Sequence, residues 1–512
     1  MLHPFPQNIL VVVQRLLVVA CCAILVMVSE EAEAQRKVQW IYSDYVEYDE
    51  AQFGRVRRAI GSVQFKHEGT YLFCDSAYFY EETNVIEAYS NVHMKESDTL
   101  NLFCQFLRYN PETAIAFARD EVVLVDPQMS LTTDELWYNL RSGVAWYDKG
   151  GVIVSRNNTL TSRKGHYFSK EKRFEFVDEV ELDHPRFILT SDTLHYNTET
   201  EVATIFGPTR IIGEENNLYS ERGIYYTQND FALLWKNSWV THEESKLYGD
   251  SIVYDGDRSF SEAYRNVILF DTVGQYIMGG HYGEYDEAAG YSFLTDSTWA
   301  VFIDNTDSLS LHADTLYLVF DSLQEGRLFM AYYGVRFFRD DLQGACDSLV
   351  YDFADSVLTM FHAPVVWFGR NQITADTIWM LFQEEELRMM QMEGAAFIIT
   401  DDRGDQYNQV KGIGITAHFS EGELREMFVH SNTETLYYVR DDDEALIGID
   451  KAVADRLRME FEEGEIVLIV YITRPVGTTY PVDEVSQDDR RLRGFLLRHD
   501  ERPASRDDIF RR

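Results

Sequence analysis

The sequence predicts an all-β fold, an elongated stack of antiparallel strand pairs, from three observations. Tyrosine recurs at intervals of 29 residues through much of the chain, as from Tyr109 to Tyr138 (138 − 109 = 29), and such a period is typical of repeat architectures. Aromatic residues occupy 14% of the 512 positions, and Tyr and Phe favour half-buried pleated surfaces. No segment repeats its apolar residues at the 3.6-residue spacing of a helix.

Each repeat begins with a strand that carries a leucine column and a tyrosine column. The apolar positions change parity between the two columns, which predicts a bulge or corner within the strand. Because a two-strand unit cannot bury its apolar face alone, stacking should line both columns along the interior. The tyrosine column is Tyr80, Tyr109, Tyr138, Tyr167, Tyr196, Tyr225 and Tyr254, and the leucine column is Leu102, Leu131, Leu160, Leu189, Leu218 and Leu247.

A turn and a second strand complete each repeat. The turn commonly starts with Asn or Asp, and the second strand alternates small and apolar residues, as in residues 114–118. We expect the second strand to end often in a polar turn before valine, as at Asn91-Val92 and Asn266-Val267. Leucine-rich repeats share the period, but they need leucine where this chain has a charged or amide side chain. The pattern predicts about a dozen repeats between residues 40 and 400.

The amino terminus has the order of a secretory signal. An apolar stretch from Leu16 to Val28 follows Arg15, and small residues then alternate up to Ala34, which predicts cleavage after Ala34 and export. A membrane anchor is the alternative, although 13 residues are short for a bilayer span. The expected organisation is a signal peptide at 1–34, β repeats at 35–400, a carboxy-terminal β extension of the same stack at 401–485, and an Arg-rich tail at 486–512, most simply a solvated one.

Charge and motifs exclude several classes of function. The chain has 46 Lys and Arg against 85 Asp and Glu, a net charge of −39, which repels the phosphate backbone of nucleic acids. Zinc, redox, hydrolase and phosphate-loop motifs are missing from the sequence, so we expect no enzyme, no metal and no cofactor. A polar column with Asp134, Asp192 and Asp250 could hold a cation or act on a glycan, but turn hydrogen bonds are the simpler interpretation.

Two cysteines occupy the same position in successive repeats. Cys74 and Cys104 each come two residues after a leucine, at Leu72 and Leu102. Neighbouring strands would place their Cα atoms within reach of a disulfide, which an oxidising compartment would favour. The alternative is that both are small core residues.

The repeated pattern resembles the OstA/LptA superfamily. Its clearest carriers are residues 189–196 with 203–207, and residues 247–254 with 263–267. The resemblance spans roughly residues 40–400, and the remainder is similar to the longer OstA-like proteins. It implies a β-jellyroll open at both ends, a periplasmic location with a possible association with the outer membrane, and a role in lipopolysaccharide transport. The implied partners are lipopolysaccharide and other transport-bridge proteins joined by edge-strand pairing.

The interior columns are the candidate lipid-binding residues, because shielding acyl chains needs an apolar lining worth about 0.8 kcal/mol per buried CH₂. The same side chains could instead fill a dry core. The alternative function is therefore a structural or adhesive β-solenoid of the cell envelope without lipid cargo, and a second alternative is a polysaccharide-active β-helix enzyme. The candidates are Leu131, Leu136, Tyr138, Leu189, Leu194, Tyr196, Leu218, Tyr225, Leu247, Ile252 and Tyr254.

Overall fold

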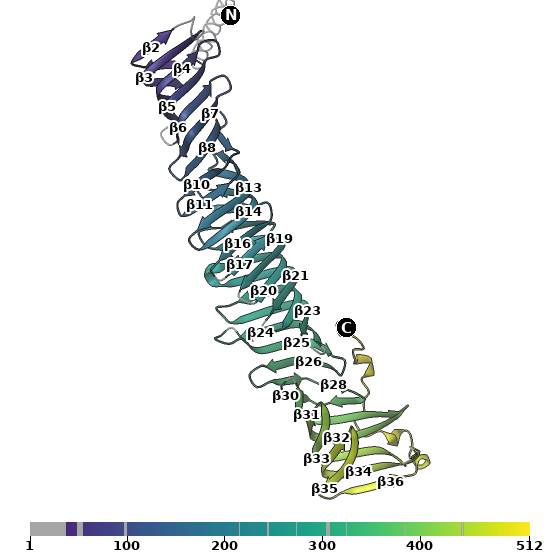
Figure 1. Ribbon diagram of the computed structural model, residues 1–512. Helices are drawn as coiled ribbons and strands as arrows, with labels where there is room; N and C mark the ends of the chain where they lie inside the picture. The colour runs from purple at the N-terminus through teal and green to yellow at the C-terminus, as the bar shows by residue number, and fades with distance from the viewer. Residues whose placement is uncertain are drawn as a thin grey trace, which may run out of the picture. The chain divides into compact units, whose positions relative to one another are not determined.

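The structure, a computed structural model, divides into two compact units between Gln228 and Asn229 (Figure 1). The predicted signal peptide at 1–34 lies outside the described residues. Within the described part of the chain, no helix is long and apolar enough to cross a membrane. The structure describes residues 37–48, 55–96, 100–214, 216–242, 245–272, 274–303, 308–323, 325–384, 386–441, 443 and 445–511.

The amino-terminal unit is an antiparallel stack in which the long strands pair with their neighbours in sequence, whereas short strands also pair with strands two or three further along the chain. β1 (Gln39–Tyr42) and β2 (Tyr45–Tyr48) pair with the two halves of β3 (Val56–His67), and the stack continues from β3 by short turns. The further strands are β4 (Thr70–Tyr80), β5 (Val85–Glu96), β6 (Leu100–Asn110), β7 (Ile115–Val125), β8 (Ser130–Asn139), β9 (Val144–Tyr147), β10 (Gly151–Ser155), β11 (Asn158–Ser162), β12 (Lys164–Phe168), β13 (Arg173–His184), β14 (Phe187–Asn197), β15 (Val202–Ile205), β16 (Thr209–Gly213), β17 (Asn216–Ser220) and β18 (Arg222–Tyr226).

The carboxy-terminal unit has the same antiparallel design. β31 to β34 are the longest strands, at 15 to 18 residues, and short 3-10 helices follow the last strand. The strands are β19 (Phe231–His242), β20 (Ser245–Asp255), β21 (Phe260–Asp271), β22 (Tyr276–Asp286), β23 (Tyr291–Phe302), β24 (Leu309–Phe320), β25 (Gly326–Phe338), β26 (Leu342–Asp352), β27 (Val357–Phe361), β28 (Val365–Phe368), β29 (Asn371–Thr374), β30 (Thr377–Gln383), β31 (Glu386–Arg403), β32 (Gln406–Ser420), β33 (Glu423–Arg440), β34 (Leu446–Glu462), β35 (Glu465–Ile472) and β36 (Val476–Tyr480). The 3-10 helices are η1 (Gly256–Arg258), η2 (Val482–Glu484), η3 (Asp488–Arg490), η4 (His499–Glu501) and η5 (Arg506–Phe510).

A bend recurs in the middle of alternate long strands, among them β3, β5, β7, β13, β21 and β23. Two consecutive residues there have positive φ, as at Ser90 and Asn91 in β5 (64° and 50°), and the pairing with both neighbouring strands shifts register around them. The ladder resumes on the far side of the bend, so β5 and β21 run on through Asn91-Val92 and Asn266-Val267. The prediction that the second strand ends at these positions is therefore wrong.

The predicted all-β, antiparallel fold is confirmed, and so is the change of parity within the leucine strand. In β6, Leu102 and Cys104 face the interior, Gln105 is exposed, and Leu107 and Tyr109 are buried again. Buried and exposed residues alternate in this way along a strand with one solvent-facing side. The register shift at the bend keeps the apolar side chains of both halves of the strand pointing into the interior. The number of repeats and the boundaries near residues 400 and 485 stay predictions.

The segment after β36 differs from the expected solvated tail. Residues 481–511 run back over the outer face of the carboxy-terminal unit and end beside β25, where the carboxy terminus is marked in Figure 1. Val485 and Ile509 are buried, and Gln372 and Gln409 of β29 and β32 hydrogen-bond to the segment. The segment is therefore partly buried although it is rich in arginine, because its apolar side chains pack and its backbone is hydrogen-bonded, and arginine can keep its charged group in water.

Candidate lipid-binding interior

The structure places all eleven candidate lipid-binding residues in the interior. None of their side chains is more than 6% exposed. Eight of them lie in the amino-terminal unit, on β8, β14, β17 and β18, and the other three, Leu247, Ile252 and Tyr254, lie on β20 of the carboxy-terminal unit. Strand pairing brings successive columns into register, as where Leu189 lies opposite Leu182 and Ile211. The chain's own side chains therefore fill the interior at these positions.

In the amino-terminal unit the tyrosine column also closes the sheet on itself. The Tyr109 hydroxyl lies 2.7 Å from Nδ1 of His67, 42 residues earlier. Tyr109 lies at one long edge of the sheet, beside the turn at 111–114, whereas His67 lies at the other long edge, beside the turn at 68–69. The bend in the strands therefore folds the sheet until its two long edges meet.

The same contact repeats along this meeting line, which we call the seam. The Tyr138 hydroxyl donates to Glu96, 42 residues earlier, and the Tyr167 hydroxyl donates to Asp126, 41 residues earlier. The Tyr196 hydroxyl accepts a hydrogen bond of 2.7 Å from Nδ2 of Asn158. Seam contacts therefore join Tyr109 to His67, Tyr138 to Glu96, Tyr167 to Asp126 and Tyr196 to Asn158.

The seam carboxylates have different environments. Burial raises the pKa of Glu96, although the hydrogen bond from Tyr138 opposes this change. Burial would also raise the pKa of Asp126, but hydrogen bonds from Tyr167, the Gln128 backbone and Lys172 outweigh it and hold that pKa below its usual value. The Lys172 ammonium lies 3.0 Å from the Asp126 carboxylate. Asp126 is thus a charged, well-paired seam residue, and Glu96 is easier to protonate.

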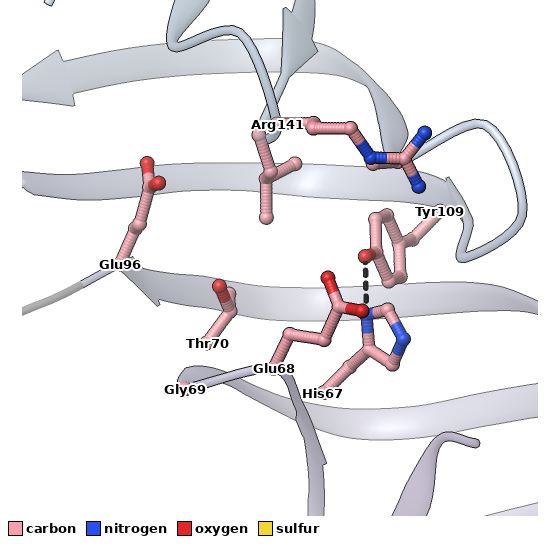
Figure 2. Close-up of a pocket in the computed structure, with 9 residues that line it drawn as sticks. His67, Glu68, Gly69, Thr70, Glu96, Tyr109 and Arg141 are labelled. Carbon is pink, nitrogen blue, oxygen red and sulfur yellow. Dashed lines mark hydrogen bonds between the residues drawn. The ribbon is translucent and has the colours of Figure 1, made fainter. Parts of the chain in front are cut away.

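A cavity of about 280 Å³ opens at the seam beside the first contact. Figure 2 shows the Tyr109–His67 contact in this cavity, with Glu68, Glu96 and Arg141 around it. Nε2 of His67 is buried without a hydrogen-bond partner. Among the described residues, no cluster of three or more His, Cys, Asp or Glu side chains could hold a metal ion.

The polar column faces outward, away from the interior. Asp134, Asp192 and Asp250 are exposed, and Asp250 accepts hydrogen bonds of 3.2 and 3.1 Å from Nδ2 of Asn266 at the bend of the next strand. This pairing supports the structural interpretation of the column at Asp250, where a side chain ties one bend to its neighbour.

Comparison with known proteins relates the first part of the chain to a family. The sequence model of a family described as OstA-like protein matches residues 35–192 and 183–250. Residues 35–250, less than half of the chain, are therefore similar to the OstA-like family. No curated protein matches the chain. Among solved structures, the chain is similar to LptH of Pseudomonas aeruginosa, described as the LptA homologous periplasmic component of the lipopolysaccharide transport device, with 10% identity and a TM-score of 0.21 over 23% of this chain and 82% of that chain.

Within the OstA-like region, the suggested disulfide between Cys74 and Cys104 is not formed. Both cysteines are free and buried. Each repeat contributes two strands, so β5 separates β4 from β6, and positions two strands apart lie about 9–10 Å from each other, beyond the reach of a disulfide. Burial raises the pKa of both thiols to about 12, and they are core residues.

Sequence reasoning missed the seam partners of the OstA-like region. His67, Glu96 and Asp126 recur at intervals of 29 and 30 residues (96 − 67 and 126 − 96), so the same periodicity that revealed the tyrosines could have found them. They vary in residue type and lie beside turns, where polar residues are expected for other reasons.

Proposed function

We propose that the chain is a periplasmic lipopolysaccharide-binding protein that shields acyl chains during transfer to the outer membrane. The observation that carries the proposal is the continuous row of apolar columns inside an OstA-like region whose long edges meet at a hydrogen-bonded seam. The similarity of residues 35–250 to the OstA-like family supports it. The candidate columns would form the acyl-chain lining, and no catalytic step is needed.

Lipid entry would require the seam to open, because the interior is filled by side chains. Each neutral seam contact contributes about 1 kcal/mol net, and a contact to a charged carboxylate such as Asp126 about 1.5–3 kcal/mol. Burying ten CH₂ groups contributes about 8 kcal/mol, part of which is offset by the side-chain contacts that the lipid displaces. A seam of a few hydrogen bonds is therefore weak enough for acyl chains to open.

The strand edges at the two ends of the chain would join it to other transport-bridge proteins. β1 and β2 form the first edge, and Tyr45 and Val46 there are 72% and 54% exposed. β35 forms the last edge with Val467 and Leu468 51% and 41% exposed, and it pairs with β34 alone among the described strands. Exposed apolar edges of this kind are sites for strand addition.

A binding experiment on the full chain tests the lipid proposal. Purified protein is incubated with fluorescently labelled lipopolysaccharide and separated from free lipid by gel filtration. We expect a saturable complex, and the double variant Tyr138→Phe with Tyr167→Phe should load several-fold faster because two seam contacts are lost while the rings remain. Labelled lipid that never elutes with folded protein would contradict the proposal.

The packed interior favours one alternative function specifically. A structural β-solenoid needs a dry core, and the chain's own side chains bury the candidate residues. The alternative predicts no binding of lipopolysaccharide by either the parent protein or the seam variant, so the same experiment separates the two functions.

A further inference from the structure

We propose that the outer face of the carboxy-terminal unit carries a peptide-binding groove, and that residues 487–511 are an exchangeable ligand held in it. The groove runs over β34, β33, β32, β29, β26 and β25, on the face opposite the interior. It is independent of the lipid proposal, since it uses none of the interior columns or seam residues.

Two buried glutamines hold the backbone of the segment by paired hydrogen bonds. Gln372 is 3% exposed; its Nε2 donates to the Leu496 carbonyl at 2.8 Å, and its Oε1 accepts from the Arg498 backbone N–H at 2.7 Å. Gln409 is fully buried and makes the equivalent pair with the Arg490 carbonyl at 2.9 Å and the Leu492 N–H at 2.8 Å.

Each glutamine therefore makes, with two alternate residues of the segment, the pair of backbone hydrogen bonds that a neighbouring β-strand would make. The amide satisfies one carbonyl and one N–H of an extended chain, which is recognition of backbone rather than of a particular side chain. Burying an amide without partners would cost roughly 1–3 kcal/mol. The two glutamines are thus suited to a bound peptide and unsuited to a bare outer face.

A third glutamine recognises an arginine side chain. Nε and Nη2 of Arg502 donate to Oε1 of Gln343 at 2.9 and 2.7 Å. Gln343, 3% exposed, is oriented by its own hydrogen bond of 2.6 Å to the Arg339 carbonyl. Nη1 of Arg498 donates to the Ala363 carbonyl at 2.8 Å. These contacts select arginine at positions 498 and 502 of the ligand.

Apolar contacts complete the groove. Residues 342–346 of β26 are all buried, whereas Phe103, which takes the place of Ala345 on β6, is 41% exposed. Ala345, Val365 and Trp367 form a small core of their own. Five buried residues in a row require cover on both faces of a strand, and the segment supplies the outer cover.

Apolar side chains of the segment anchor it at several points. Leu492 packs against a cluster that contains Leu436 and Ile449. The Phe495 ring centroid lies 5.5 Å from that of Tyr407, and Ile509 is 2% exposed. The ligand class is therefore an extended peptide with apolar anchors and with arginines six and ten residues after the first of them (498 − 492 and 502 − 492).

The connection to β36 contributes little to these contacts, so the segment should stay bound when it is cut. Ser486 and Gln487 are exposed, and the contacts of the segment with Gln343, Gln372 and Gln409 all lie after them. Across the cut, the Arg490 side chain donates to the Val482 and Val485 carbonyls. The test uses the full chain with a protease site, flanked by glycine and serine, inserted between Ser486 and Gln487. A second version carries the insertion between Asp483 and Glu484, in case the first disturbs folding.

After cleavage, gel filtration and mass spectrometry measure whether the cut segment stays with the protein. A fluorescent synthetic peptide of residues 487–512 is then added, and fluorescence anisotropy follows its uptake. We expect the cut segment to be replaced saturably by the labelled peptide, whether it is retained or lost before the peptide is added; a folded, cut protein that takes up no labelled peptide would contradict the proposal. Peptides with Leu492→Asp or Arg502→Ala should compete at least tenfold less well, and these variants cannot disturb the fold of the body.

Two results would overturn the proposal. One is a folded, cut protein that takes up no labelled peptide, whether or not it keeps the cut segment. The other is competition by both substituted peptides, Leu492→Asp and Arg502→Ala, as strong as that by the parent peptide, since the contacts of Leu492 and Arg502 would then have no role in binding.

Discussion

The seam tyrosines meet two requirements with one side chain. The ring of Tyr138 fills the interior, and its hydroxyl reaches a carboxylate at the opposite edge of the folded sheet. Buried hydroxyls need a partner, because an unpaired one costs about 1–3 kcal/mol. Phenylalanine would fill the interior equally well but would leave Glu96 without its partner, so the seam depends on the hydroxyl.

Tyr138→Phe should lower the free energy of unfolding by about 1–2 kcal/mol, since it leaves a half-buried carboxylate with a missing donor. Tyr89→Phe is the matched control, because its hydroxyl also donates to a glutamate, Glu87, at 3.1 Å but does so on the outer face. Urea unfolding followed by circular dichroism measures both. A loss for Tyr89→Phe equal to that for Tyr138→Phe would show that the seam has no special role.

At the scale of single residues, sequence periodicity predicts which side chains are buried but not what they pair with. Six of the seven column tyrosines, from Tyr109 to Tyr254, are inside as expected. Tyr80 is not, because it is half-buried and its hydroxyl donates to Glu87 on the outer face. The seam partners of the column lie 38 to 42 residues earlier, and only the folding of the sheet onto itself brings them close. The 29-residue period predicts which face of the sheet a residue occupies, but the meeting of the two sheet edges depends on the bend.

At the scale of elements, the bend determines where the interior lies. Paired left-handed residues turn a strand without ending its ladder, as at Arg265 and Asn266 in β21. The sequence showed polar residues before valine and suggested turns, because Asn, Asp and Ser favour both turns and left-handed backbone. A turn that ends a strand and a bend within a strand use the same residue types, and only the continued strand pairing beyond the bend distinguishes them.

The edge strand β35 allows a prediction at this scale. An affinity-tagged chain should retain lipopolysaccharide-transport bridge proteins from a periplasmic extract, and Val467→Lys with Leu468→Lys should reduce their amount at least fivefold, because lysines block edge pairing. Ile188→Lys, at an exposed position of the internal strand β14, is the control. Quantitative mass spectrometry measures the retained proteins, and equal retention by the edge variant and the parent would refute the pairing.

At the scale of the whole molecule, the all-β antiparallel architecture follows from the repeat, but the outer groove of the carboxy-terminal unit does not. Gln343 and Gln372 are 29 residues apart (372 − 343), yet isolated glutamines in a polar sequence carry no signal that they are buried. The Arg-rich composition of residues 486–512 favours a solvated tail. The few apolar side chains of this segment can pack only after the strands that form the outer face have folded, so the sequence alone does not show that they are anchors.

Site-specific photo-crosslinking tests the lipid-carrier account most directly. A diazirine analogue of leucine is placed at Leu194 or at Ile188, which face opposite sides of β14 and are fully buried and 45% exposed. The loaded protein is irradiated and examined by mass spectrometry. The account predicts lipopolysaccharide adducts at position 194 and not at 188. Adducts at 188 alone, or reaction of position 194 only with the chain's own side chains, would contradict it.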